Sequence, residues 1–260
     1  MLLAVDIGNT NIKFGFFDGE DLVFESVVRT DRAKTSDEFA IELYTILKVY
    51  DISADSIDSS IIGSVVPQIT PRMKQAIKAL TGLSALVVGP GIKTGINIKI
   101  ENPTTTGADL VAASVAAGEL YPCPCIVVGL GTATTIIAVD EDKAMLGGAL
   151  LPGVSLSLNA LTSTSALLFD IALEAPKNVI GKNTDECLRS GVIYGTAAML
   201  DGLIDRFEEE LGHNCTVVAA GGNAPMIIGN CRHKIELRKD LFLQGLRILY
   251  ERNRKHPHKG

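Results

Sequence analysis

AVDIGNTNIKFGFFDGEDL (Ala4–Leu22) and VVGLGTATTIIAVDEDKAM (Val127–Met145) share one pattern: an apolar strand, a Gly-Thr turn, a second strand and an acidic turn. Asp6 precedes the first turn, and Gly129 stands at the matching place in the second, an offset of 123 residues and close to half the chain. Because the hairpin pattern recurs on both sides of the turn, we interpret the chain as a duplication. Two similar domains that face each other are expected to leave a ligand cleft between them.

The first copy continues with further elements of both kinds. IKFGFF and LVFESVV, separated by the hairpin signal Asp18-Gly19, predict antiparallel strands beside the first one. A helix with capping-box spacing at its start is expected over residues 35–50, and another over residues 71–82. Apolar strands follow each helix at residues 60–66 and 84–89. This order predicts an α/β fold, with a mixed sheet flanked by helices in each copy.

A break in the pattern, YPCPC (residues 121–125), separates the expected domains 1–120 and 121–260. Before it lie an irregular Gly-, Pro- and Thr-rich loop and a helix. After it we expect the second hairpin, a strand into a Gly-Pro loop, and helices over 155–168, 184–211 and 240–254. The strand TVVAA runs into the turn Gly221-Gly222-Asn223 before the last helix. The pattern leaves open whether that last helix packs on the first domain or covers a dimer interface.

The bulk composition argues against several classes of function. The chain has 260 residues, 24 Lys and Arg against 30 Asp and Glu, a net charge of −6 and no Trp, which argues against nucleic-acid binding. We expect no membrane segment, because no stretch has the length and apolarity to span a bilayer outside Gly-rich or helical core patterns. The five cysteines include no CxxC pair and no zinc spacing. Together these features predict a cytoplasmic protein whose thiols are buried or half-buried.

The first turn has the chemistry of a phosphate site. Gly8 to Asn11 offer backbone N–H groups and short polar side chains at one point, and such a concavity binds anions. Asp6 is suited to hold Mg²⁺ directly or through water, and Lys13 to reach a phosphate. The turn matches neither a Walker loop nor a Rossmann turn. The alternative is an ordinary hairpin with an acid at the strand end. Likewise, the Gly221-Gly222 turn suits a nucleobase or is a simple tight turn.

These motifs carry a resemblance. DIGNTNIKFG, GTATT and AAGGN resemble the two phosphate motifs and the adenosine motif of the actin-like, sugar-kinase and Hsp70 ATPase superfamily. ENPTTTGAD, GGALLPGV and VIGKNTDECLRSGVIYG are similar to the type III pantothenate kinases, and the match extends from Asp6 to Asn223. The resemblance implies two ribonuclease-H-like domains with ATP between them. It also implies transfer of the γ-phosphoryl group of ATP to the primary hydroxyl of pantothenate, the first step toward coenzyme A.

The resemblance also implies roles for individual residues. Asp109 would be the catalytic base; from its place at a helix start alone, it would more readily be an acid that stabilises the helix dipole. Asp6 would position Mg²⁺, and a monovalent cation (K⁺ or NH₄⁺) and a homodimer with the acceptor site at its interface are expected. The residues implied to contact ATP are Asp6, Ile7, Gly8, Asn9, Thr10, Asn11, Ile12, Lys13 and Thr132. The residues implied to contact pantothenate are Gly107, Ala108, Asp109, Leu110 and Thr184.

Three positions depart from the family pattern. Leu110 replaces the arginine expected near the substrate, and an apolar side chain cannot replace a bidentate carboxylate clamp. Ile100 replaces an aromatic that covers the substrate, and Gly129 replaces the Asp expected to coordinate the monovalent cation. Lys93 or Lys99 could supply the missing positive charge. Two alternatives therefore stand beside the pantothenate kinase: a weak or inactive nucleotide-binding paralogue, and a kinase for another small hydroxyl substrate.

Overall fold

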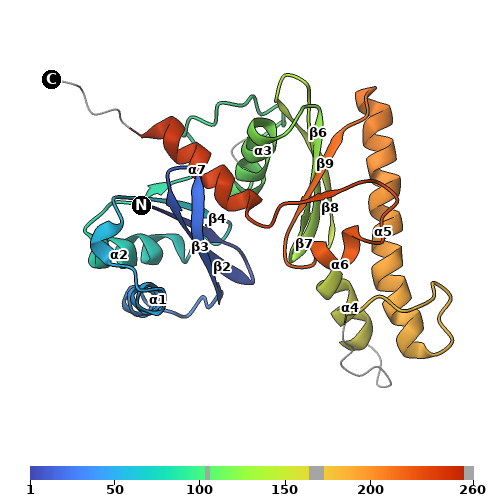
Figure 1. The fold of residues 1–260 in the computed structure, drawn as a ribbon, viewed down its shortest axis with the longest axis horizontal. Helices are drawn as coiled ribbons and strands as arrows, with labels where there is room; N and C mark the ends of the chain where they lie inside the picture. The colour runs from blue at the N-terminus through green and yellow to red at the C-terminus, as the bar shows by residue number, and fades with distance from the viewer. Residues whose placement is uncertain (103–105, 164–172, 255–260) are drawn as a thin grey trace. The chain divides into compact units, whose positions relative to one another are not determined.

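The structure is a computed structural model that describes residues 1–102, 106–163 and 173–254. The chain divides into two compact units (Figure 1). Unit 1 comprises Met1–Gly95, Asn102–Ala116 and Leu241–Gly260, and unit 2 comprises Ile96–Glu101 and Ala117–Asp240. These units differ from the expected division into 1–120 and 121–260, because the last helix belongs with the first unit. The chain therefore starts in unit 1 and returns to it.

Unit 1 is built on a five-stranded sheet with the order β3-β2-β1-β4-β5. Strands β1 (Leu2–Ile7), β2 (Asn11–Asp18) and β3 (Asp21–Arg29) are antiparallel neighbours, as the hairpin signals predicted. Strands β4 (Ser59–Ser64) and β5 (Leu86–Val87) add in parallel on the other side of β1. The predicted strand over residues 84–89 is thus reduced to a two-residue pairing at the sheet edge.

Helices α1 (Ser36–Val49) and α2 (Thr70–Thr81) and the short 3₁₀ helix η1 (Ala54–Ser56) follow the strands of this sheet. Thr35 and Glu38 form the expected capping box, and Gly82 ends α2 in the left-handed conformation at φ 74°. Alternate residues of β1 point to opposite faces of the sheet. Leu3, Val5 and Ile7 of β1 pack into a core with the buried faces of α1 and α2.

Helices α3 (Ala108–Leu120) and α7 (Leu241–Asn253) use small residues for close packing in unit 1. A Cβ on Gly15 of β2 or Gly63 of β4 would come within 2.9 Å or 2.8 Å of the side chains of Leu243 and Leu246. A Cβ on Gly245 would collide with the carbonyl oxygen of Ala112 in α3. These contacts settle the open position of the last helix: it packs on the sheet of unit 1, opposite the core of α1 and α2.

Unit 2 repeats the sheet of unit 1 in the order β8-β7-β6-β9-β10. Strands β6 (Cys125–Leu130), β7 (Ala133–Val139) and β8 (Met145–Pro152) are antiparallel, and β9 (Thr216–Ala220) and β10 (Glu236–Leu237) extend the sheet in parallel. The offset of 123 residues maps the first and last residues of β1 onto those of β6. The duplication expected from the sequence is therefore present in the topology.

Three helices complete the core of unit 2: α4 (Val154–Ser163), α5 (Thr184–Leu211) and α6 (Ala224–Ile228). Helix α5 has the predicted bounds, and the side chain of Asn183 caps it by accepting a hydrogen bond from the backbone N–H of Glu186. Of the helix expected over 155–168, residues 164–168 lie outside the described residues. Buried side chains of α4, α5 and α6 pack against Ile126, Val128 and Leu130 of β6.

Two further expectations concern membrane-spanning helices and the burial of the cysteines. Across the described residues, every helix is too short or too polar to cross a membrane. The five cysteines are free thiols, and all are buried or half-buried except Cys187, which is exposed near the start of α5. The prediction was wrong for Cys187, because its helical position places it on the solvent side.

Candidate functional site

The end of strand β1 places a carboxylate beside the first turn. Asp6 and Lys13 are directly opposite each other in the β1–β2 ladder, so their side chains share one face of the sheet. The face is not that of Leu3, Val5 and Ile7, because side chains alternate along a strand. Asp6 therefore lies on the face that α7 covers, away from the core formed with α1 and α2.

The turn between β1 and β2 is held closed by its own backbone and by two side chains from beyond β3. The N–H of Gly8 donates to the carbonyl of Asn11 at 3.0 Å. The hydroxyl of Thr30 donates to the carbonyl of Gly8 at 2.7 Å, and the guanidinium of Arg32 donates to Oδ1 of Asn9 at 2.9 Å. These hydrogen bonds hold residues Gly8–Asn11 in one conformation, so the turn is preorganised for a ligand.

Helix α3 contributes the second carboxylate of unit 1. Asp109 lies in the first turn of α3, and its Oδ1 accepts a hydrogen bond from the backbone N–H of Leu110 at 2.9 Å. Gly107 immediately precedes the helix, and a Cβ there would collide with Oδ1 of Asp109 and approach Val65 at 3.4 Å. Because Gly107 has no Cβ, the Asp109 carboxylate can occupy this space.

The two carboxylates perturb the local electrostatics. Burial, the negative charge of Asp109 and, less strongly, that of Glu25 raise the pKa of Asp6 to about 7, while Lys13 opposes them. Burial also raises the pKa of Asp109, although hydrogen bonds from the backbone N–H groups of Leu110 and Asp109 itself act in the opposite direction. A pair of desolvated acids whose charges repel each other is typical of a functional site.

This charge distribution fits a divalent cation. Mg²⁺ takes oxygen ligands and commonly uses one or two carboxylates together with phosphate oxygens. Asp6 offers a carboxylate whose ionised form is disfavoured by its surroundings, and a cation beside it would favour that form. Asp6 is therefore the residue that would hold Mg²⁺.

In unit 2 two glycine-containing turns meet at the end of β6. The turn Gly131-Thr132 is closed by a hydrogen bond from the N–H of Gly131 to the carbonyl of Ala133 at 3.1 Å. Gly153 packs so closely that a Cβ there would collide with the carbonyl oxygen of Thr132. Gly221, at φ 108°, lies against the carbonyl of Leu130 and likewise leaves no room for a Cβ. The two predicted nucleotide turns of unit 2 are thus brought together.

The residues present do not fit the expected monovalent-cation site. Gly129 is buried in β6 between Thr135 on β7 and Ala220 on β9. A glycine has no side-chain oxygen, so it cannot supply the carboxylate ligand that the resemblance implies.

The remaining candidates lie at several places in the fold. Thr184 is exposed at the start of α5, while Leu110 and Ile100 are half-buried. Lys99, considered as a substitute for the missing arginine, forms an ion pair with Asp140 at 2.9 Å. Unit 1 therefore brings together Asp6, the turn Gly8–Asn11, Lys13 and the Gly107–Leu110 segment, and unit 2 brings Thr132 to the Gly221 turn.

Comparisons with known proteins agree with these motifs. The family model described as type III pantothenate kinase matches residues 2–206. The chain belongs to the type III pantothenate kinase family. A type III pantothenate kinase of Moorella thermoacetica is 42% identical over 97% of this chain and 100% of its own length. A type III pantothenate kinase of Exiguobacterium sp. is 39% identical over 98% of this chain and 100% of its own length.

Solved structures support the fold of this family member. A Baf family transcriptional activator from Campylobacter jejuni has a TM-score of 0.62 at 19% identity, covering 96% of this chain and 98% of its own. Component A of (R)-2-hydroxyglutaryl-CoA dehydratase from Acidaminococcus fermentans has a TM-score of 0.53 at 14% identity, covering 94% of each chain. With the repeated sheet order, these likenesses confirm the expected α/β fold, in which mixed sheets are flanked by helices.

Two residues of the site escaped the sequence analysis of this pantothenate kinase family chain. Thr30 and Arg32 lie just past β3 and donate hydrogen bonds to Gly8 and Asn9 of the turn between β1 and β2. The β2–β3 hairpin carried a usable signal, because its register pairs Asn11 with Arg29. A residue that follows Arg29 is therefore brought to the turn that precedes Asn11.

Proposed function

We propose that this chain transfers the γ-phosphoryl group of ATP to the primary hydroxyl of pantothenate, the first step toward coenzyme A. The observation that carries the proposal is the juxtaposition, within unit 1, of a rigid N–H-rich turn with two desolvated carboxylates. Phosphoryl transfer requires positioning and neutralisation of charge more than covalent help from the protein. The substrate is inferred from the relatives, which are type III pantothenate kinases matched over their full length.

Asp109 is the proposed catalytic base. Its ionised carboxylate would orient the acceptor hydroxyl and take its proton as the bond to phosphorus forms. Burial moves the pKa of Asp109 toward neutral pH. A carboxylate with a higher pKa is a better proton acceptor when it is ionised. Gly107, Ala108 and Leu110 surround it in sequence and are the proposed acceptor-site residues, with Thr184.

The segment Asp6–Lys13 is the proposed phosphate site. Backbone N–H groups of the turn would bind phosphate oxygens, and Lys13 would add a positive charge on the same face as Asp6. Mg²⁺, when bound, neutralises charge on the phosphates. Asp6 would hold it, Thr132 would contact the nucleotide from unit 2, and the Gly221-Gly222 turn would lie against the base.

A homodimer is the proposed assembly, with the acceptor site at its interface. Unit 2 exposes large apolar side chains, including Leu150 at 75%, Val179 at 63% and Ile180 at 82%. Burying such side chains against a second copy would remove apolar surface from water. Sedimentation analysis at several concentrations would test this, and a monomer throughout would contradict it. The free thiols fit a reducing cytoplasm as the location.

The decisive experiment measures ATP-dependent phosphorylation of pantothenate by the full chain, with Asp109→Asn as the control. We expect turnover in the wild type and a loss of about 10²–10⁴-fold in kcat for the variant. The assay is run with and without K⁺ and NH₄⁺, because Gly129 leaves the cation requirement open to measurement. Turnover no greater than that of Asp109→Asn would sink the proposal.

A further inference from the structure

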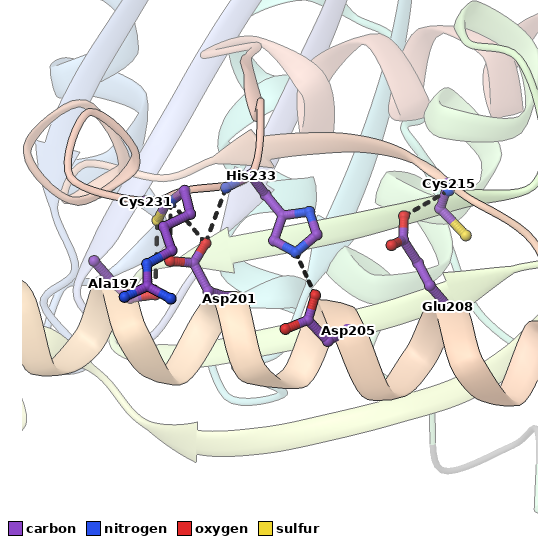
Figure 2. A network of polar contacts seen from close by, with 8 residues as sticks. Ala197, Asp201, Asp205, Glu208, Cys215, Cys231 and His233 are labelled. Atoms are coloured by element: carbon purple, nitrogen blue, oxygen red, sulfur yellow. Dashed lines mark hydrogen bonds and ion pairs between the residues drawn. The ribbon is translucent and has the colours of Figure 1, made fainter.

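A cluster of three metal-binding side chains lies in unit 2, on residues to which the proposed kinase chemistry gives no role. Among the described residues, Asp205 and Glu208 of α5 and His233, between α6 and β10, place one ligand atom each within 4.8 Å of one another. Figure 2 shows the imidazole of His233 pointing from its loop toward Asp205 on the helix. The donors thus come from two separate segments that converge on one point.

The helix and the loop present their donors to each other directly. Asp205 and Glu208 are three residues apart, so a helix places their side chains on one face. Nε2 of His233 lies 2.7 Å from Oδ1 of Asp205. An ion that binds this nitrogen and this oxygen would take the place of the hydrogen bond between them.

Further hydrogen bonds fix the backbone around the cluster. Asp201, one turn before Asp205 and only 8% exposed, accepts hydrogen bonds from the backbone N–H groups of Arg232 and His233. Oε1 of Glu208 accepts one from the N–H of Cys215 at 2.7 Å (Figure 2). The loop that carries His233 is therefore tied to α5 by a buried carboxylate that is not itself a ligand, as supporting groups around metal sites commonly are.

An open depression of the surface adjoins the two carboxylates. It has a volume of about 660 Å³ and is lined by Asp205, Glu208, Glu209, Gly212, His213 and Asn214. Water molecules can enter it to complete the coordination of an ion, and His213 is among the residues that line it. The side chain of His233 is 24% exposed and that of Asp205 is 63% exposed, so the donors are accessible to an ion from solution.

We propose that Asp205, Glu208 and His233 form a binding site for a divalent transition-metal ion, of which Zn²⁺ is the best match. An imidazole nitrogen with carboxylate oxygens suits zinc, whereas magnesium and calcium prefer oxygen ligands alone. Bound there, the ion links α5 to the segment between α6 and β10. That segment follows the Gly221-Gly222-Asn223 turn, so the site would stabilise the part of unit 2 that carries the turn.

The test uses the full chain without an affinity tag and measures Zn²⁺ binding by calorimetry and by the shift of the thermal unfolding midpoint. We expect His233→Ala and Asp205→Asn each to weaken binding by at least about 10-fold and to abolish most of the shift. Mg²⁺ is the comparison ion and should give neither signal at this site. Circular dichroism without metal shows whether each variant is folded, and Asp205→Asn keeps the shape of the side chain if His233→Ala fails.

Matched controls separate this site from other zinc-binding groups. Glu210→Gln removes a neighbouring acid of α5, Cys123→Ser removes one of two thiols that lie 3.9 Å apart, and His256→Ala with His258→Ala removes the histidines near the C-terminus. All three should leave the zinc-dependent shift unchanged. The proposal is overturned if wild type and His233→Ala bind zinc equally, if only a control loses binding, or if zinc does not bind at all, in which case Asp205 and His233 form a hydrogen bond only.

Discussion

The hairpins β1–β2 and β6–β7 have the same place in two sheets of the same order, yet their chemistry differs. In the first, Asp6 faces Lys13 across the ladder; in the second, Gly129 faces Thr135. The side chains of Thr30 and Arg32 hold the first turn by hydrogen bonds. The backbone of Gly153 packs against the second turn. Duplication preserved the scaffold and left charged chemistry in one copy and close backbone packing in the other.

Replacing the acid of the charged copy should have the largest effect. We expect Asp6→Asn to lower kcat/KM by about 10³-fold, because the residue that would hold Mg²⁺ is lost and charge on the phosphates is less well neutralised. Steady-state kinetics at several Mg²⁺ concentrations measure this. Asp18→Asn, in the exposed turn at the far end of β2, is the control and should be neutral. Equal activities of the two variants would contradict a special role for the first hairpin.

The same substitution should also change the pH dependence of stability. The pKa of Asp6 rises from 3.8 to about 7 on folding, so the folded state disfavours the ionised form. This acid therefore stabilises the fold least above about pH 7, and stability falls as pH rises from about 4 to 7. Asp6→Asn removes that loss and should be more stable than wild type by about 4 kcal/mol at pH 8 but not at pH 4. Urea unfolding at both values measures it, and a variant less stable at pH 8 would contradict the assignment.

A methyl group at Gly107 should disturb the base without removing it. We expect Gly107→Ala to lower kcat by about 10–100-fold, because its Cβ displaces the Asp109 carboxylate from its position and small misplacements of reacting groups are costly. Gly118→Ala makes the same change within α3, where the new Cβ meets Lys143 at an ordinary 3.4 Å. That control should keep full activity, and a matching loss in both variants would show that the helix rather than Asp109 is affected.

Restoring an acid in the second copy tests the other side of the comparison. We expect Gly129→Asp to increase the dependence of activity on K⁺ or to raise activity by up to about 10-fold, because a carboxylate is added where the strand offers no side-chain ligand. A K⁺ titration of kcat measures it, with a melting curve to follow the cost of a buried acid. An unchanged titration would mean that a cation site is absent or is built from other residues.

The smallest effect is expected from loosening the first turn. Thr30→Val removes the hydrogen bond to the carbonyl of Gly8 and should raise the KM for ATP about threefold, since one such bond contributes roughly 0.5–1.5 kcal/mol. The value of kcat should change little. Thr45→Val removes a comparable bond on exposed α1 and serves as the control. A rise in KM in both variants would remove the link to the phosphate turn.

Local signals predicted much of the fold. The capping box at Thr35, the left-handed Gly82 and the Asn183 cap each satisfy helix-end groups through neighbouring residues, so the sequence window contains the whole interaction. The position of α7 could not be predicted in this way. A helical pattern identifies the apolar face of α7 but not its partner, and the close packing depends on Gly15, Gly63 and Gly245 from distant segments.

The candidate site was predictable to a different extent in each part. The spacing of Asp6, the Gly8 turn and Lys13 indicated a phosphate site directly, whereas Asp109 became a candidate only through the family resemblance. Its proximity to Asp6 depends on how α3 packs in unit 1, which no local pattern encodes. The cluster of Asp205, Glu208 and His233 could not be predicted for a similar reason. His233 contacts Asp205 because the backbone of its loop is hydrogen-bonded to Asp201, which is distant in sequence.

The return of α7 to unit 1 has a consequence for the order of events during protein synthesis. Unit 2 is contiguous apart from Ile96–Glu101, so nearly all of it leaves the ribosome before Leu241 does. Until then the sheet of unit 1 has Gly15 and Gly63 without the leucines that cover them. The half of the enzyme that is translated first is therefore completed last, and a chain released early would present an open apolar sheet to the chaperones of the cell.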